Sequence, residues 1–346
     1  MQTFKQARIG LRLHRIRPLS GMPVRHGGAG IVRVIAANGV RLDAHQVAIP
    51  MAGRKFDRVT YSLSKELTMY KTILVHVDGN ARSAARVEFA ARFALANDAH
   101  LVGLAPTGLS ALMYPLSAMG AAMPPVAFPI DEIRDSAERS LDLFDSRARQ
   151  LGVASPERRL VDEETGDGLC LQARYADLVV ISAPTAGDAV LFMRPDYTEY
   201  VLLNCARPVL VLPAAGAGGA IGKRVTVAWN GSVEAVRAIS GALALLQGAA
   251  QVDLVVVGKN DQQDLRGEQP GADIALYLAR HGIKVDLSTV HGGGDDGEAL
   301  LSFAAEKGSD LIVMGAFGHS RLREFVLGGV SRTALRSSPI PLWMAH

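Results

Sequence analysis

An internal repeat constrains the fold of this chain more than any other feature of its sequence. Three short stretches of the first half return in the same order in the second half, with a period of roughly 140 residues. A period of that length is too long for a solenoid of small units, so it indicates two duplicated domains. The matched pairs are 71–79 with 223–232, 176–182 with 309–315, and 206–213 with 338–344.

Short apolar runs alternate with longer helical patterns in both halves. Such alternation is typical of parallel strands joined by right-handed crossovers, with helices on both faces of the sheet. The predicted strands are 73–77, 100–105, 159–162, 178–182 and 209–212 in the first half, and 224–229, 252–257, 284–290, 311–314 and 340–344 in the second. The predicted helices are 81–96, 131–151, 169–175 and 196–205, then 233–246, 269–281, 296–307 and 331–337.

The basic charge of the chain is concentrated before the repeat. Residues 1–68 hold 12 Lys and Arg against 3 acidic residues, a net charge of +9, whereas the remainder holds 25 against 31, a net charge of −6. We interpret 1–68 as a disordered or non-native extension, with Met69 as the true start, and a genuine basic arm is the alternative. The domains would then be 69–213 and 223–346, joined by a small-residue linker at 214–222.

The composition predicts a soluble protein with a large core. The chain has 346 residues and is 49% hydrophobic. Cys170 and Cys205 are not spaced like a metal-binding or Cys-x-x-Cys pair, so we expect reduced thiols and a cytoplasmic location. The uncharged segment 101–130 contains five prolines and does not suit a membrane-spanning helix. We expect neither a membrane nor a nucleic acid as partner.

A glycine-rich turn follows the fourth predicted strand of the second half. The apolar run ends at Gly315, and Gly318 and Gly328 follow. Glycines let the backbone turn sharply and let a ligand approach its amides, and the free N–H groups of a helix N-terminus favour phosphate. Judged by the glycine pattern alone, an ordinary strand-to-helix turn explains the segment as well as a phosphate-binding loop does.

The spacing Gly315-x2-Gly318-x9-Gly328, with Val330-Ser331 after it and a closing apolar segment at 339–344, resembles the nucleotide loop and last strand of the universal stress protein family. Over about residues 70–346 the chain resembles two such proteins in tandem. The resemblance implies an α/β fold with two five-stranded, parallel, doubly wound Rossmann-like sheets of strand order 3-2-1-4-5. Ligands then belong at the carboxyl ends of the first and fourth strands, where the order reverses. The family likeness also implies self-association through last-strand edges, within one chain as a pseudo-dimer or between two chains as a homodimer.

The resemblance implies an adenine-nucleotide site in the second domain. In the nucleotide-binding branch of the family, an aspartate near the first turn and a valine at the end of the second strand cradle the adenosine, and a serine or threonine after the third glycine touches phosphate. Here these positions hold Asn230, Val257 and Gly329. Asn230-Gly231 is also a common turn pair. The predicted site residues are Asn230, Val257, Gly315, Gly318, His319, Gly328, Gly329, Val330 and Ser331.

The first domain keeps Asp78-Gly79 but lacks a Gly-x-x-Gly loop, and Pro184 removes an amide donor. We therefore predict that its site is empty. In the second domain we interpret Arg321 and Arg323 as a solvated helix face, and Asp295 and Asp296 as helix caps rather than magnesium ligands.

The chain carries no catalytic motif that we recognise, such as a Walker lysine or a Gly-x-Ser-x-Gly elbow, so we expect no catalytic residues and no metal site. The leading hypothesis is a stress-linked sensor or interaction module that binds ATP or another adenine nucleotide, with magnesium as a possible companion. Two alternatives stay open: a slow magnesium-dependent ATPase that uses Asp295 or Asp296, and a structural stress protein that binds no nucleotide. A cleft plugged by Trp229 or Phe317 would argue against the nucleotide site.

Overall fold

The computed structural model describes residues 32–35, 41–46, 59–62, 70–110, 129–185, 197–216, 219–257, 271–290, 295–317 and 329–346. The chain separates into two units, Met1–Glu66 and Leu67–His346. The first unit holds β1 (Val32–Ile35), β2 (Arg41–Gln46) and β3 (Val59–Ser62), which form an antiparallel sheet in that order. The sequence analysis derived no fold for this segment. Most of the predicted disordered extension lies outside the described residues.

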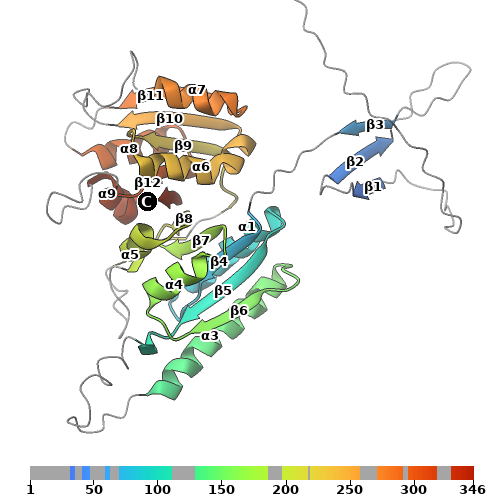
Figure 1. Cartoon of the computed structure of the whole chain (residues 1–346), viewed down its shortest axis with the longest axis vertical. Coiled ribbons are helices and arrows are strands. Elements are labelled where there is room, and N and C mark those ends of the chain that lie inside the picture. Colours follow the sequence, from blue (N-terminus) through green and yellow to red (C-terminus); the bar gives the residue numbers. More distant parts are fainter. Residues whose placement is uncertain are drawn as a thin grey trace, which may run out of the picture. The chain divides into compact units, whose positions relative to one another are not determined.

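The second unit is built on a single sheet of ten strands (Figure 1). Its order is β11-β10-β9-β12-β13-β8-β7-β4-β5-β6. The strands of the first half are β4 (Thr72–His76), β5 (His100–Pro106), β6 (Glu157–Val161), β7 (Leu178–Ser182) and β8 (Val209–Leu212). Those of the second half are β9 (Arg224–Trp229), β10 (Gln251–Val257), β11 (Val285–Val290), β12 (Leu311–Gly315) and β13 (Leu342–Ala345).

The two halves join through their last strands. All pairs within each half are parallel, whereas β8 and β13 pair antiparallel, with Trp343 opposite Leu210. The sequence analysis predicted two five-stranded sheets, with association through their last-strand edges within one chain or between two, and the structure has one continuous ten-stranded sheet. The reason is that β8 and β13 pair with each other, so each last strand completes the hydrogen bonding of the other and both are buried along their whole length.

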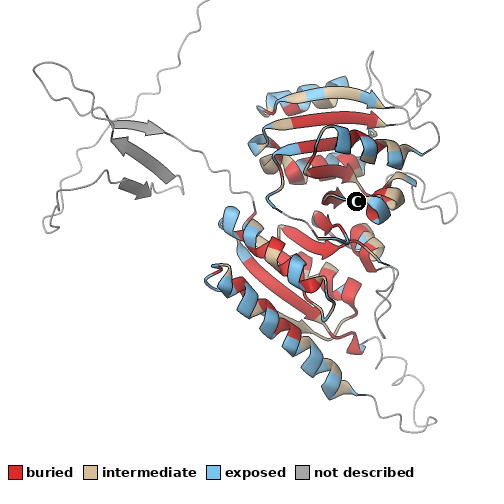
Figure 2. Cartoon of the chain, turned by 180° about the vertical axis from the view of Figure 1, so that it is seen from behind, coloured by how far each residue is buried: buried red, intermediate tan, exposed pale blue. Residues whose placement is uncertain are grey.

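Helices cover both faces of this sheet, whose central strands are buried (Figure 2). Side chains along a strand alternate between two buried clusters. One cluster takes Ile73 and Val75 of β4, and the other takes Leu74 between them. The first face carries α1 (Ser83–Ala96), α3 (Ile130–Gln150), α6 (Val233–Gly248) and α7 (Ala272–Arg280), and the second carries α4 (Thr165–Ala173), α5 (Tyr197–Asn204), α8 (Asp296–Glu306) and α9 (Gly329–Ser337). Among the described helices, none combines the length and the apolar character that a membrane crossing needs.

Both halves fix the start of their first strand in the same way. Asp177, just before β7, accepts hydrogen bonds from the backbone N–H groups of Lys71 and Thr72 at 2.7 and 3.0 Å. Asp310, just before β12, accepts the corresponding bond from the backbone N–H of Lys223 at 2.9 Å. The matched aspartates of the repeat therefore tie the first and fourth strands together, which places their carboxyl ends side by side.

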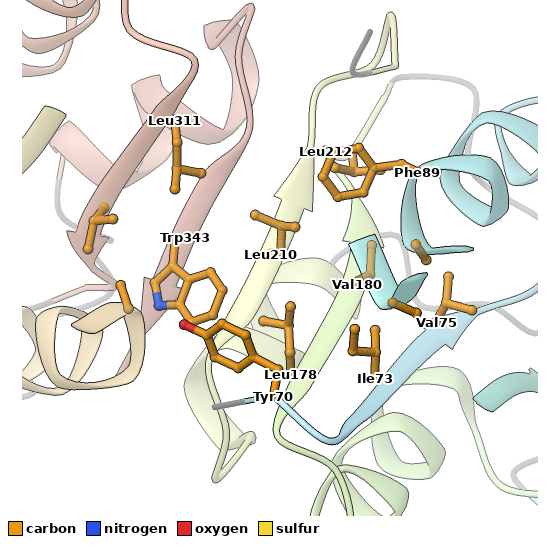
Figure 3. Close-up of a cluster of buried hydrophobic side chains, with 14 of the residues drawn as sticks. Tyr70, Ile73, Val75, Phe89, Leu178, Val180, Leu210, Leu212, Leu311 and Trp343 are labelled. Atoms are coloured by element: carbon orange, nitrogen blue, oxygen red, sulfur yellow. The ribbon is translucent and has the colours of Figure 1, made fainter. Parts of the chain in front are cut away.

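Aromatic side chains fill the seam between the halves (Figure 3). The rings of Tyr70 and Trp343 lie 5.4 Å apart between centroids, and both side chains are buried. The Tyr70 hydroxyl donates to the backbone carbonyl of Gly241 in α6 at 2.8 Å. Burial of two large aromatic groups and one long-range hydrogen bond stabilises this junction.

Candidate functional site

A cavity of ≈ 140 Å³ lies where β9 and β12 end in the second half. Six of the nine predicted site residues line it, namely Asn230, Val257, Gly315, Gly329, Val330 and Ser331. Ala228, Trp229, Leu300 and Met314 complete the lining. Gly318, His319 and Gly328 lie outside the described residues. The cavity sits at the point where the sheet order reverses, which is the usual ligand position in an open α/β sheet.

The end of β9 is held by a tight turn. The side-chain oxygen of Asn230 accepts the backbone N–H of Ser232 at 3.1 Å, and Gly231 adopts the left-handed region at φ 75°. Ser232 in turn caps α6, because its hydroxyl accepts the N–H of Ala235 at 3.1 Å. Asn230 is thus a turn residue that also forms part of the cavity wall.

Gly315 is required by packing. A Cβ at this position would lie 2.6 Å from the backbone nitrogen of Ala235 and 2.9 Å from Glu234. The end of β12 therefore abuts the first turn of α6 more closely than any side chain allows. The sequence analysis attributed this glycine to ligand approach, and the contact with α6 is a second reason for it.

The turn after β12 is bonded to the start of α9. The backbone N–H of Phe317, a residue in the left-handed region at φ 57°, donates to the hydroxyl of Ser331 at 3.1 Å. Ser331 is buried in the first turn of α9. The turn after Gly315 and the start of α9 at Gly329 therefore meet at the rim of the cavity.

Neither of the two suspect aromatic side chains closes the cavity. Trp229 is half-buried and forms part of the wall, and the cavity remains beside it. Phe317 is not among the lining residues and packs against the buried hydrophobic cluster on the second face of the sheet. Gly329 opens α9, and a Cβ added there would meet no heavy atom of the described residues within 4 Å.

Of the two acidic residues near this corner, Asp295 caps a helix. Asp295 accepts the backbone N–H groups of Gly297 and Glu298 at 2.7 and 3.1 Å, and the Thr333 hydroxyl donates to its other oxygen at 3.3 Å. Asp296 is the first residue of α8. Within the described part of the chain, no group of three or more His, Cys, Asp and Glu is arranged to hold a metal ion. Arg321 and Arg323 lie outside that part.

A buried arginine holds the corresponding corner of the first half together. Arg86 is 1% exposed, and its guanidinium donates to the carbonyl of His76, the hydroxyl of Ser182 and the carboxylate of Asp78 at 2.6, 2.8 and 2.9 Å. The matched buried position in α6 is Ala238, which is small. Asp78, at the position where the resembling family contacts adenosine, is therefore occupied by an ion pair within the chain.

A buried histidine lies at the same corner. His76 is 0% exposed, and its ring lies against Tyr197 with centroids 5.4 Å apart. Neither ring nitrogen of His76 has a hydrogen-bond partner among the described residues. Burial lowers the pKa of His76 to about 4, so the ring is neutral at pH 7. The matched residue in β9 is Ala228, which lines the open cavity of the second half.

Comparison with known proteins assigns the two halves. The pattern of the Universal stress protein family matches residues 69–213 and 222–346. The chain belongs to the universal stress protein family. Its two halves are universal stress protein domains in tandem, joined in this structure into one sheet.

Individual relatives are distant. The chain is 28% identical over 199 residues to the universal stress protein Slr1230 of Synechocystis sp., which covers 56% of this chain and 66% of that protein. It shares the fold of a universal stress protein from Archaeoglobus fulgidus DSM 4304, with a TM-score of 0.58, 18% identity, and coverage of 79% of this chain and 95% of that one. A universal stress protein from Archaeoglobus fulgidus in complex with dAMP matches 41% of this chain and 97% of its own, at 23% identity and a TM-score of 0.30.

Sequence reasoning missed Arg86 and His76 as the buried groups of the first corner. Arg86 falls on the apolar face of the predicted helix 81–96, and a charged residue at such a position was a signal that could have been used. His76 falls inside an apolar strand run. Met314 and Leu300 line the open cavity of the second half. Their sequence positions do not reveal this role, because both have the apolar side chains of ordinary core residues.

Proposed function

We propose that this universal stress protein binds an adenine nucleotide, with ATP as the first candidate, in the corner of its second domain. It would act in the cytoplasm as a stress-linked sensor or interaction module. The observation that carries the proposal is the cavity at the ends of β9 and β12, whose walls include Asn230, Val257 and the first residues of α9. Residues far apart in the sequence meet there, at the switch point of the sheet.

The size of the cavity indicates which part of the nucleotide it takes. Its ≈ 140 Å³ is smaller than the roughly 300 Å³ at which ligand pockets begin, so it suits a base or ribose rather than a whole nucleotide. The phosphates would extend toward the first turn of α9, where backbone N–H groups lack partners within the helix. Because the oxygen of Asn230 is used in the turn, its side-chain nitrogen is the group that would donate to the ligand.

Only the second domain would bind nucleotide. In the first domain, the buried His76 stands where Ala228 lines the cavity of the second, and the buried Arg86 stands where the second has the small, buried Ala238. A ligand could take their place only if one of these side chains moved. Movement of Arg86 would separate its buried charge from its partners, and movement of His76 would expose its buried ring. We therefore propose one site per chain, with the first domain as scaffold.

The ATPase alternative gains no support from Asp295, since both of its oxygens are engaged in hydrogen bonds at the start of α8. A structural protein without nucleotide remains the outcome that a failed binding test would indicate. Magnesium, if it accompanies the nucleotide, would be held largely by the phosphates themselves.

Calorimetry on the full chain tests the proposal. Wild type should bind ATP with a stoichiometry of about one per chain, the usual behaviour of a single pocket. Val257→Trp should abolish binding, because the indole fills the cavity that Val257 lines. Thr289→Trp is the matched control, since Thr289 is exposed on the neighbouring strand β11, and binding should survive there. A folded wild-type chain without a heat signal for ATP would refute the proposal.

A further inference from the structure

A second cavity lies at the seam between the two halves. It has a volume of ≈ 340 Å³, and its walls come from α1 of the first half, α6 of the second and the linker residues 219–222. We call this space, between Phe93 and Ala244, the seam cavity. Its volume exceeds the roughly 300 Å³ at which ligand pockets begin, so it can take a whole small molecule. The proposed nucleotide site does not use it.

Small residues keep the seam cavity open. The linker contributes Ala220 and Gly222 to the lining, and α6 contributes Ala244 and Gly248. Gly222 adopts the left-handed region at φ 90°, and a Cβ there would lie 2.7 Å from the side chain of Leu245. The linker therefore runs closer to α6 than any side chain allows, and it forms a wall of the cavity without filling it.

Three aromatic rings form the apolar wall of the cavity. The rings of Tyr70 and Phe93 lie 5.9 Å apart between centroids, and those of Phe89 and Phe93 lie 6.2 Å apart and nearly parallel. Tyr70 and Phe89 belong to the buried cluster at the seam (Figure 3), whereas Phe93 is half-buried. A further ring at similar spacing would continue this series and cover Phe93. The wall therefore suits a flat aromatic ligand.

The charge beside the cavity is positive. Among the described lining residues, only Arg92 is charged. One oxygen of Glu88 pairs with Nη2 of Arg92 at 2.6 Å, and its other oxygen pairs with Nη2 of Arg147 in α3 at 2.6 Å. Two guanidinium groups thus share one carboxylate, and the cluster keeps one net positive charge. A guanidinium has five N–H donors, so Arg92 can bind a second anion beside Glu88.

We propose that the seam cavity binds a small aromatic anion that carries one carboxylate or sulfonate group. The ring lies against Tyr70 and Phe93, and the anionic group pairs with Arg92. Charge selects this class of ligand, because an aromatic cation is repelled by the Arg92 cluster and a neutral ring leaves its charge uncompensated.

The seam cavity and the proposed nucleotide cavity lie at opposite ends of α6. The turn at Asn230, just before this helix, lines the nucleotide cavity, and Ala244 and Gly248 near its other end line the seam cavity. The helix has 16 residues and is therefore about 24 Å long. The two cavities share no described lining residue, so the inference does not depend on nucleotide binding.

Fluorescence titration of the full chain with anilinonaphthalene sulfonate tests the inference, because this probe is an aromatic anion. Folded wild type should bind about one probe per chain, as expected of a single pocket. Phenylnaphthylamine, which has the same rings without the sulfonate, is the neutral counterpart and should also bind.

Arg92→Met separates the role of the charge from that of the apolar wall. The anionic probe should bind about five- to tenfold more weakly, between the effects of an exposed ion pair and a charged hydrogen bond, and the neutral probe should bind as before. Glu88 keeps Arg147 as its partner in this variant. Arg139→Met is the matched control, since Arg139 is exposed in α3 outside the cavity lining, and both probes should bind it as they bind wild type.

Filling the cavity should remove both probes. Ala244→Trp places an indole in the space, whereas Val236→Trp, two turns earlier in α6 at a position 46% exposed, should leave binding intact. Circular dichroism checks folding. Hydrogen–deuterium exchange locates the probe without any variant, because the bound probe should slow exchange at residues 219–222 and in the last turn of α1.

Four outcomes would overturn the inference. These are no saturable binding of the anionic probe by folded wild type, equal affinity changes for both probes in Arg92→Met, full binding by folded Ala244→Trp, and protection from exchange elsewhere in the chain. Displacement of the probe by excess ATP would place it in the nucleotide cavity and would also overturn the inference.

Discussion

Replacing Gly329 by serine tests the proposed nucleotide site most directly. In the family that this chain belongs to, the nucleotide-binding branch carries a serine or threonine that touches phosphate at this position. Gly329 opens α9 and lines the cavity, and a Cβ there meets no heavy atom within 4 Å in the part of the chain that the structure describes. Gly329→Ser therefore adds a hydroxyl at the proposed phosphate position without a steric cost.

The expected gain follows from a single hydrogen bond. A hydrogen bond to a charged group contributes about 1.5–3 kcal/mol, and ~1.4 kcal/mol corresponds to a tenfold change in Kd. ATP should therefore bind about 10- to 150-fold more tightly to Gly329→Ser than to a variant that lacks the hydroxyl. Loss of glycine also stabilises a helix by roughly 0.5–1 kcal/mol, so the reference must not be glycine.

Gly329→Ala is the matched reference, since it changes the backbone freedom and adds the same Cβ without the hydroxyl. Isothermal titration calorimetry of both variants with ATP and with adenosine separates the phosphate contact from the adenosine contact. Tighter binding should be confined to ATP. The reasoning is wrong if the serine variant binds ATP no better than the alanine variant, or if adenosine gains as much as ATP.

Three further outcomes follow from the packing of the two corners. Gly315→Ala should lower stability by about 1–3 kcal/mol in thermal melts, because its Cβ would press on the backbone of Ala235, and an unchanged melt would contradict this packing. Arg86→Met should cost about 3–5 kcal/mol in urea denaturation, since it strands the Asp78 carboxylate, and Asp78→Asn in the same chain should recover part of that loss. His76 titrates at about 4 when folded and near ~6.5 when unfolded, so the unfolded state binds more protons between these values and stability should fall by roughly 3 kcal/mol as the pH drops through them. His76→Ala should flatten this pH dependence relative to wild type, and equal slopes would show that His76 is not the titrating group.

Local patterns were sufficient to place most elements of the repeat. The predicted strands 178–182 and 209–212 coincide with β7 and β8, because continuous apolar runs between polar turns leave little alternative. The start of α6 was predicted at Val233, and Ser232 supplies the cap there. In these segments the turn or capping residues and the spacing of the apolar residues indicate the same element.

The start of α4 was predicted too late, at residue 169 instead of Thr165. Its cap is Glu164, whose carboxylate accepts the N–H of Gly166 at 2.9 Å. Glutamate is not among the usual capping residues, and two glycines in the first turns weaken the helical pattern. The local sequence therefore argues against a helix that the packing against α5 stabilises.

Only those features of the candidate site that follow from the fold could be predicted from the sequence. The switch point of the sheet and the turn at Asn230 follow from topology and turn chemistry. The bond between Phe317 and Ser331 and the contact of Gly315 with α6 depend on how separate elements pack. No local pattern encodes such contacts, because each joins residues that are distant in the sequence.

The antiparallel junction of β8 and β13 has a consequence for how the protein responds to its ligand. Two equal subunits meeting in this way would present two identical clefts, and one could influence the other. Here both halves belong to one polypeptide, so their ratio cannot vary. The outermost strands of the joined sheet are β6 and β11. With one proposed site per chain, occupancy should rise with nucleotide concentration along a simple hyperbola, as in a monomeric receptor.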